Sequence, residues 1–315
     1  MTRTMLLAFG AAAAAAFACD DADDRNPFPS APALAVTPPP AFGAKIAFHS
    51  SRQPHGCCQV YVMNADGTGQ TRLTSSGVNA FPAWSPNGRE IAFNSFRDGN
   101  LEVYVMNGDG SGQRDITNYP GARDFSAVWS PDGQRIAFVS DRDGSLQLYV
   151  MNADGSDQRR LIATETQELY TCDWSPDGRR ILFAASDRDA NFDVFSVNVD
   201  GSEMTNLTNN AALDFCDMWS PDGRQIAFES DREGHLDIFV MGADGSHPAN
   251  LSQDPVYADG ANWSPDGHHL AFASRRDANF EIYVMNADGT GQTNLTNDPA
   301  SDRGANWSRG RLSVP

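Results

Sequence analysis

The chain has 315 residues, with 41 acidic against 23 basic side chains and a formal net charge of −18. Lys45 is its only lysine. This composition argues against a nucleic-acid partner, because phosphate backbones are bound by clustered lysine and arginine.

The N-terminus has the features of an export signal. In residues 1–18, Arg3 precedes an alanine-rich apolar core that is too short for a transmembrane helix, and the small-x-small sequence Ala16-Phe17-Ala18 stands directly before Cys19. A cysteine at this place is typical of bacterial lipoproteins. We expect lipidation of Cys19 and a location in the periplasm or at the cell surface, with simple secretion as the alternative.

Residues 19–43 are acidic and then rich in proline. Such a composition predicts an extended, disordered tether. The lipid anchor is then the only expected contact with a membrane.

Tryptophan recurs at a near-constant interval in the rest of the chain. The six tryptophans are separated by 45, 45, 45, 44 and 44 residues, each is followed by Ser, and the first five by Ser-Pro-(Asp/Asn)-Gly. They are Trp84, Trp129, Trp174, Trp219, Trp263 and Trp307. A period in the forties with strand-like content predicts a β-propeller with one four-stranded blade per repeat.

Each repeat contains the parts of one antiparallel blade. After the Ser-Pro-Asp-Gly turn come an Ile-Ala-Phe strand, a Tyr-Val-Met strand, an Asn-Ala-Asp-Gly hairpin turn and a short Leu-Thr strand. The two apolar strands do not alternate with polar residues, so we expect both of their faces to be buried between blades.

The ends of the repeat array predict how the ring closes. The first Ile-Ala-Phe strand, at residues 46–48, has no tryptophan before it, and Trp307 has only a shortened tail after it. Residues 303–308 should therefore supply the inner strand of the first blade. The expected fold is all-β: a monomeric six-bladed propeller of four-stranded antiparallel blades over residues 44–315, with no room for a second domain.

The sequence Trp-Ser-Pro-Asp-Gly-x-x-Ile-Ala-Phe, followed by Tyr-Val-Met-Asn-Ala-Asp-Gly, resembles the WD40-like (PD40) repeat of TolB-type propellers over roughly residues 44–310. The resemblance implies a propeller of the bacterial envelope that binds partner proteins around its top and channel mouth. The TolB family also carries an α/β domain before the propeller, so a stand-alone TolB-like propeller is the closer description.

A second periodic set consists of arginine and aspartate. An arginine follows each Ile-Ala-Phe strand, with a serine two residues before it, and an aspartate stands four or five residues before most tryptophans. The arginines are Arg52, Arg97, Arg142, Arg188, Arg232 and Arg276, and the aspartates are Asp124, Asp214, Asp259 and Asp302. Strand direction places both sets at one end of the propeller, as an Arg–Asp girdle around one mouth of the channel.

Two interpretations of this girdle remain open. Arginine repeated in every blade suits a stabilising clamp, because its planar fork binds carboxylates bidentately. The alternative is contact with a partner, with the aromatic residues that differ between blades as anchors. The predicted partner-binding residues are Arg97, Arg142, Arg188, Arg232, Tyr170, Phe215, Asp124, Asp214 and Asp259. Packing at the blade junctions is the alternative role for the aromatic residues.

Cys172 and Cys216 stand two and three residues before consecutive tryptophans, on neighbouring inner strands. A disulfide and two buried free thiols are both consistent with this placement. No zinc site is expected, because there is no Cys-x-x-Cys and the histidines are scattered. No cofactor and no catalytic residue are predicted.

Two functions follow as hypotheses. The first is an exported, lipid-anchored interaction module of the bacterial envelope that binds a protein or peptide and is not an enzyme. The alternative is a polysaccharide lyase or hydrolase with a metal in its channel.

Overall fold

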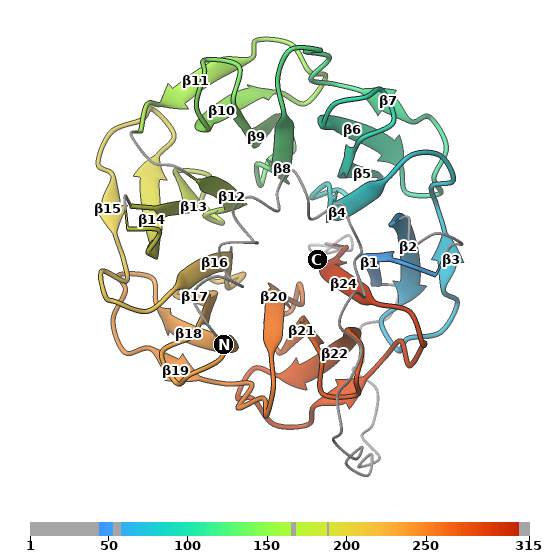
Figure 1. Ribbon diagram of the computed structural model, residues 1–315, viewed down its shortest axis with the longest axis vertical. Coiled ribbons are helices and arrows are strands. Elements are labelled where there is room, and N and C mark those ends of the chain that lie inside the picture. Colours follow the sequence, from blue (N-terminus) through green and yellow to red (C-terminus); the bar gives the residue numbers. More distant parts are fainter. Residues whose placement is uncertain (1–43, 53–57, 165–167, 188, 309–315) are drawn as a thin grey trace, which may run out of the picture.

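The computed structural model describes residues 44–52, 58–164, 168–187 and 189–308. These residues form six four-stranded antiparallel sheets arranged as blades around a central axis (Figure 1). The all-β, six-bladed propeller predicted from the tryptophan period is confirmed. Within the described ranges there is no helix with the length and apolar character needed to span a membrane. The predicted signal peptide, Cys19 and the tether lie outside the described residues.

All blades have the same strand order from the axis outward. The inner strands are β24 (Asp302–Trp307), β4 (Asn79–Trp84), β8 (Asp124–Trp129), β12 (Leu169–Trp174), β16 (Asp214–Trp219) and β20 (Ala258–Trp263). The second strands are β1 (Lys45–Ser50), β5 (Glu90–Ser95), β9 (Arg135–Ser140), β13 (Arg180–Ser186), β17 (Gln225–Ser230) and β21 (His269–Ser274). The third strands are β2 (Gln59–Asn64), β6 (Glu102–Asn107), β10 (Gln147–Asn152), β14 (Phe192–Asn198), β18 (Asp237–Gly242) and β22 (Glu281–Asn286). The outer strands are β3 (Thr71–Arg72), β7 (Arg114–Asp115), β11 (Arg159–Ile162), β15 (Thr205–Asn206), β19 (Ala249–Asn250) and β23 (Thr293–Asn294).

The C-terminal strand closes the ring, as the sequence predicts. Strand β24 pairs antiparallel with β1, with Trp307 opposite Ile46 and Asp302 opposite Ser50. Beyond the strand, the Ser308 amide donates to the Lys45 carbonyl at 2.7 Å. This closure covers the inner edge of the first blade, which would otherwise be free to pair with another chain.

The core lies between the blades. The phenylalanine of each Ile-Ala-Phe strand is almost completely buried against the neighbouring blade. These residues are Phe48, Phe93, Phe138, Phe183, Phe228 and Phe272. Burial on both faces explains why these strands read as continuous apolar runs.

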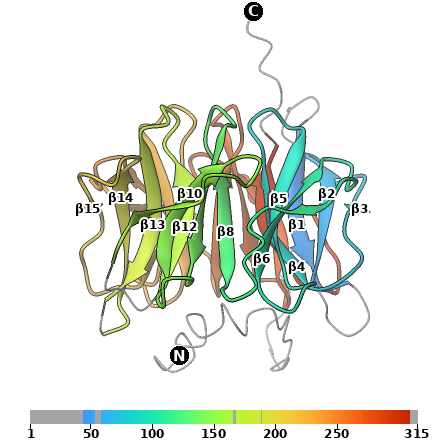
Figure 2. The ribbon, with the colours of Figure 1, turned by 90° about the horizontal axis from the view of Figure 1, so that it is seen from above.

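The loops and turns gather at the two ends of the strands, which Figure 2 shows from the side of the ring. The Arg mouth is the end where the inner strands begin, and it carries the arginine loops and the connections between blades. The Trp mouth is the end where the inner strands finish, and it carries the Ser-Pro-(Asp/Asn)-Gly turns.

Every inner strand has a register shift against its second strand, close to the middle of the channel. Four of the shifts contain a residue with left-handed backbone: Phe81, Ser126, Gly260 and Gly304, with φ of 53°, 54°, 65° and 64°. At Gly304, a Cβ would lie only 2.7 Å from His49 Nδ1, so the position requires glycine. Phe81 adopts the same conformation with a large side chain, which is a sign of backbone strain.

Candidate binding site in the central channel

The repeated arginine lies inside its own blade. Arg142 donates from Nη2 to Asp124 Oδ2 at 2.9 Å and from Nε to Ser140 Oγ at 2.8 Å. Its guanidinium carbon also lies 5.4 Å and 4.9 Å from the ring centroids of Phe138 and Tyr149. The arginine therefore joins the first three strands of the blade, as expected for a clamp.

The clamp recurs with different partners. Arg232 pairs with Asp214 at 3.0 Å, and Arg52 pairs with Asp302. In the second blade, Arg97 Nη2 donates to the neutral Oδ1 of Asn79 at 2.9 Å. The carboxylates of Asp124 and Asp214 are fully buried, so a partner cannot reach them. This geometry favours the clamp interpretation for these residues. Arg188 lies outside the described residues.

Asp259 is not part of the girdle, so its assignment to the girdle was wrong, whereas its role in partner binding stays a prediction. In that blade the clamp arginine, Arg276, pairs instead with Asp254. Asp259 stands four residues before its tryptophan rather than five. Since successive side chains of a strand point to opposite faces, this shift by one residue turns Asp259 toward the channel. There it forms an ion pair with Arg303.

A cavity of about 350 Å³ occupies the channel on the side of the Arg mouth and is called the channel cavity below. Five of the six blades contribute to its wall the residue that stands four positions before the tryptophan. The residue at this position in the remaining blade, Ala80, does not line the cavity. The others are Phe125, Tyr170, Phe215, Asp259 and Arg303. Three consecutive blades thus contribute an aromatic arc, and the next two contribute a carboxylate and a guanidinium.

The aromatic arc is held by ring contacts. The ring centroids of Phe125 and Tyr170 are 6.2 Å apart. Phe192, from β14, lies between Tyr170 and Phe215, with ring-centroid distances of 5.9 Å and 4.6 Å. Because packed rings need little ordering on binding, these side chains are suited to act as anchors for a ligand.

The wall next to Phe215 is acidic, because Asp217 and Glu229 belong to the same blade as Phe215 and Asp259 belongs to the next blade. The Glu229 carboxylate accepts from the Gly260 amide at 2.8 Å and lies beside Asp217 and Asp259. Burial, followed by the charge of Asp259, raises the pKa of Glu229 to about 8. Burial, followed by the charge of Glu229, also raises the pKa of Asp217 well above its usual range. These two acids therefore retain protons at a pH where exposed carboxyls have lost them.

His49 lies next to Arg303 in the wall. Its Nδ1 accepts from the Phe81 amide at 3.4 Å, and the His49 and Phe81 ring centroids are 4.9 Å apart. Burial, followed by the charge of Arg303, lowers the pKa of His49 to about 3, so the ring is neutral at physiological pH. Phe81 itself is 51% exposed, which makes it an accessible aromatic group in a strained backbone position.

The sequence contains a signal for this wall that the predicted set of binding residues did not include. The residue just before the repeated serine differs in most blades, whereas the residues around it repeat. These residues are His49, Asn94, Val139, Ala185, Glu229 and Ala273. The shift in the inner strand lies beside this position, and His49, Asn94 and Glu229 line the channel cavity.

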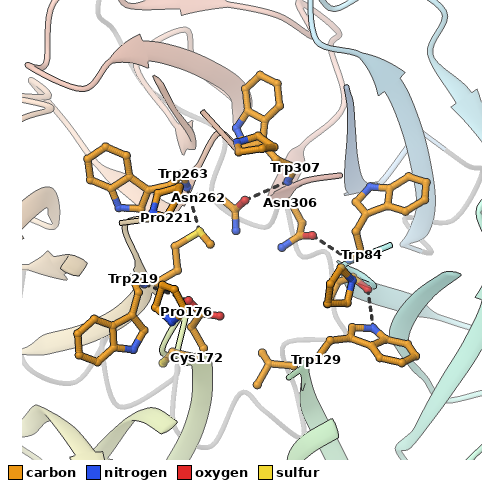
Figure 3. Close-up of a pocket in the computed structure, with 16 residues that line it drawn as sticks. Trp84, Trp129, Cys172, Pro176, Trp219, Pro221, Asn262, Trp263, Asn306 and Trp307 are labelled. Atoms are coloured by element: carbon orange, nitrogen blue, oxygen red, sulfur yellow. Dashed lines mark hydrogen bonds between the residues drawn. The ribbon is translucent and has the colours of Figure 1, made fainter. Parts of the chain in front are cut away.

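The channel narrows to a second cavity of about 210 Å³ at the Trp mouth, which Figure 3 shows with its ring of tryptophans. Asn306 Oδ1 accepts from the Trp84 amide at 2.8 Å, and Asp173 Oδ2 accepts from the Trp219 amide at 3.0 Å. Each of these bonds joins one blade to the next.

Two blades use a different bond for the same purpose. Ala83 and Val128 have no polar side chain at the position before the tryptophan, and there the indole of the next tryptophan donates to the backbone carbonyl. The Trp129 and Trp174 Nε1 atoms lie 3.2 Å from the carbonyls of Ala83 and Val128. The tryptophans therefore connect the blades, and the residues of the Trp mouth have a structural role.

A disulfide joins Cys172 to Cys216 across β12 and β16, with 5.8 Å between the Cα atoms. Of the two alternatives left open by the sequence, the structure has the bridge. In the portion of the chain that the structure describes, no group of three or more His, Cys, Asp or Glu side chains could hold a metal ion.

Two stretches of the sequence, residues 74–184 and 159–261, match the family model of the PD40 TolB beta propeller domain. Together they span more than half of the chain. The chain belongs to the TolB β-propeller family. The comparison with curated proteins gives no match.

Solved structures show the same fold at low sequence identity. TolB from Acinetobacter baumannii has a TM-score of 0.76 and 20% identity, over 85% of this chain and 67% of that one. A putative TolB from Agrobacterium tumefaciens has a TM-score of 0.67 and 24% identity, over 83% and 91% of the two chains. An oligogalacturonate lyase in complex with manganese is more distant, with a TM-score of 0.56 and 16% identity over 79% and 73%.

Proposed function

We propose that this protein is a TolB-like interaction module of the bacterial envelope, exported and anchored through lipid on Cys19. It binds a protein or peptide at the Arg mouth, over the channel cavity. The observation that carries this proposal is the channel cavity itself: an accessible pocket of about 350 Å³ in which an aromatic arc faces charged side chains.

The distribution of variable residues supports the choice of mouth. On a rigid scaffold, binding concentrates where the residues differ between repeats. The aromatic anchors of this proposal are Tyr170 and Phe215, joined by Phe81, and Asp259 contributes a charge from the blade next to that of Phe215. Arg97, Arg142 and Arg232 are proposed to support the loops around the mouth rather than to bind by themselves.

The partner can be identified by capture from an envelope extract with the mature, immobilised protein. The expected result is a protein that is retained by the wild type and lost when Tyr170 and Phe215 are both replaced by alanine. Equal retention by the double variant would contradict binding in the channel cavity.

The anchor is tested separately. Cys19→Ala should move the protein from the membrane fraction to the soluble fraction, because the acyl chains of a lipoprotein hold it in the bilayer. A wild-type protein that is already soluble after fractionation would assign the signal to simple secretion. The lyase or hydrolase alternative stays a prediction, and turnover assays on acidic polysaccharides with added divalent metals test it.

A further inference from the structure

Three oxygen atoms in the wall of the channel cavity are buried and have no hydrogen-bond partner among the described residues. They are Asn94 Oδ1, Thr171 Oγ1 and Asp217 Oδ2. Asn94 and Thr171 are only 3% and 6% exposed. Buried polar atoms are almost always paired in folded proteins, because a buried atom that has lost its water and found no partner destabilises the fold. Asn94 Oδ1 can only accept a hydrogen bond, and the Thr171 hydroxyl and the Asp217 carboxyl can accept one as well, so a ligand that carries donors can pair with all three.

The charge of the cavity points to the same class of ligand. Asp217, Glu229 and Asp259 stand together on β16, β17 and β20, and Arg303 from β24 is the cation that faces them. The other groups on this side are neutral: the Tyr257 hydroxyl, whose pKa is raised by burial and by Asp259, and the His49 ring. The Asp259 carboxylate therefore balances the Arg303 guanidinium, while Asp217 and Glu229 are held as neutral acids. A further cation is balanced when one of these two acids gives up its proton.

The unpaired oxygens lie on opposite sides of the channel. Asn94 belongs to the blade of β4 and Asp217 to the blade of β16, and these blades face each other across the axis (Figure 1). Thr171 belongs to β12, next to β16. A ligand that satisfies both sides must carry donors at two ends of a stem, and the aromatic arc offers that stem an apolar wall.

We propose that the channel cavity binds a primary alkylammonium group whose stem carries a second N–H donor at its far end. The ammonium lies against Asp217 and Glu229, the stem passes along Tyr170 and Phe215, and the second donor reaches Asn94. Aromatic faces and carboxylates are the surroundings in which proteins hold such cations. The chemistry is that of a lysine side chain with its backbone amide, or of a free diamine.

Binding of the cation is coupled to proton release. Below about pH 8 the Glu229 carboxyl is protonated in the empty cavity, and it ionises to pair with the ammonium, so one proton leaves for the solvent. The affinity should therefore fall by about fiftyfold from pH 8 to pH 6, with the slope approaching about tenfold for each unit of pH at the lower end. If the partner supplies a lysine side chain, this inference rests on the proposed function and adds the chemical identity of the group that enters the channel.

Calorimetric titration of the full chain with pentane-1,5-diamine and with N-acetyl-lysine amide tests the proposal, with pentane-1,5-diol as the uncharged probe. We expect both amines to bind at pH 8 and the diol not to bind. Titration in two buffers of different ionisation enthalpy should show release of a proton. Tighter binding of the lysine amide would favour a partner's side chain as the source, and tighter binding of the diamine a free polyamine.

Two variants and a matched control locate the site. Glu229→Gln should weaken both amines at least tenfold at pH 8 and abolish the proton release. Asn94→Leu should weaken the diamine several-fold but leave pentylamine, which lacks the second donor, unchanged. Glu168→Gln removes a partly buried carboxyl at the same mouth that does not line the cavity, and it should bind like the wild type.

Thermal unfolding of each variant confirms that it is folded. Absence of amine binding by the wild type, or equal binding by the folded Glu229→Gln variant, would overturn the inference. The proposed function would still stand in that case if the partner is captured and then lost in the Tyr170/Phe215 variant. If the amines bind but no partner is captured, the inference stands and the proposed function fails.

Discussion

The two ends of the channel come from one repeat, yet they differ in how much their residues vary. At the Trp mouth each blade ends its inner strand with the same tryptophan, and hydrogen bonds at this ring tie blades to their neighbours. At the Arg mouth the row four residues before the tryptophan reads Ala, Phe, Tyr, Phe, Asp and Arg. The tryptophans that join neighbouring blades are the same in every repeat. The residues that differ between repeats lie around the channel cavity.

The largest effect should come from the end whose residues repeat. Trp174 is fully buried, and its indole donates to the preceding blade, so Trp174→Ala should lower the free energy of unfolding by about 3–5 kcal/mol. Tyr170→Ala, four residues earlier in the cavity wall, should lower it by about 1–2 kcal/mol because this side chain is only partly buried. Urea denaturation measures both, and equal losses would remove the distinction between scaffold and site.

The clamp can be separated from a partner contact by comparing two blades. Arg142→Ala leaves the fully buried Asp124 unpaired and should destabilise the fold by about 3 kcal/mol. Arg97→Ala leaves the neutral Asn79 and should destabilise it by about 1 kcal/mol.

Addition of Asp124→Asn to Arg142→Ala serves as the control for the clamp and should restore much of the lost stability. Variants that remain fully stable but lose partner binding would instead place these arginines in the interface.

The acidic wall should impose a pH dependence on stability. The folded pKa of Glu229 is raised, so the folded state holds more protons than the unfolded chain between pH 4.5 and about 8. Its contribution is therefore most favourable below pH 4.5 and is lost as the pH rises toward 8. We expect the free energy of unfolding of Glu229→Gln, compared with that of the wild type at the same pH, to be more favourable at pH 8 than at pH 5. Identical pH profiles for the two proteins would contradict the raised pKa.

The smallest effect should come from the strained aromatic residue. Phe81→Gly removes a side chain that is half exposed and gives a left-handed residue the freedom it needs, so the free energy of unfolding should rise by about 0.5–1 kcal/mol. The same change should weaken partner binding. A clear loss of stability would mean that the contact between Phe81 and His49 outweighs the strain.

The sequence was sufficient for the architecture because closure depends on residues that repeat. The tryptophan spacing and the missing tryptophan before Ile46 predicted the blades and the pairing of β24 with β1. The candidate site was harder to predict from the sequence, because its residues become neighbours only through the register shift in the inner strands. The repeat pattern places Asp259 in the girdle, although its spacing differs by one residue. Glu229 stands in a strand that otherwise repeats, and the predicted set of binding residues does not include it.

The affinity of the captured partner for two sets of variants tests the central claim most directly. One set is Tyr170→Ala with Phe215→Ala in the channel cavity, and the other is Met204→Ala with Asp154→Asn at the turns of the Trp mouth. Met204 is an apolar control because it is 54% exposed. The account predicts that the first pair weakens binding by about 2 kcal/mol or more while the second leaves it unchanged. Loss of binding in the folded Trp-mouth pair, with none in the Tyr170/Phe215 pair, would place the working surface at the other end and contradict the account.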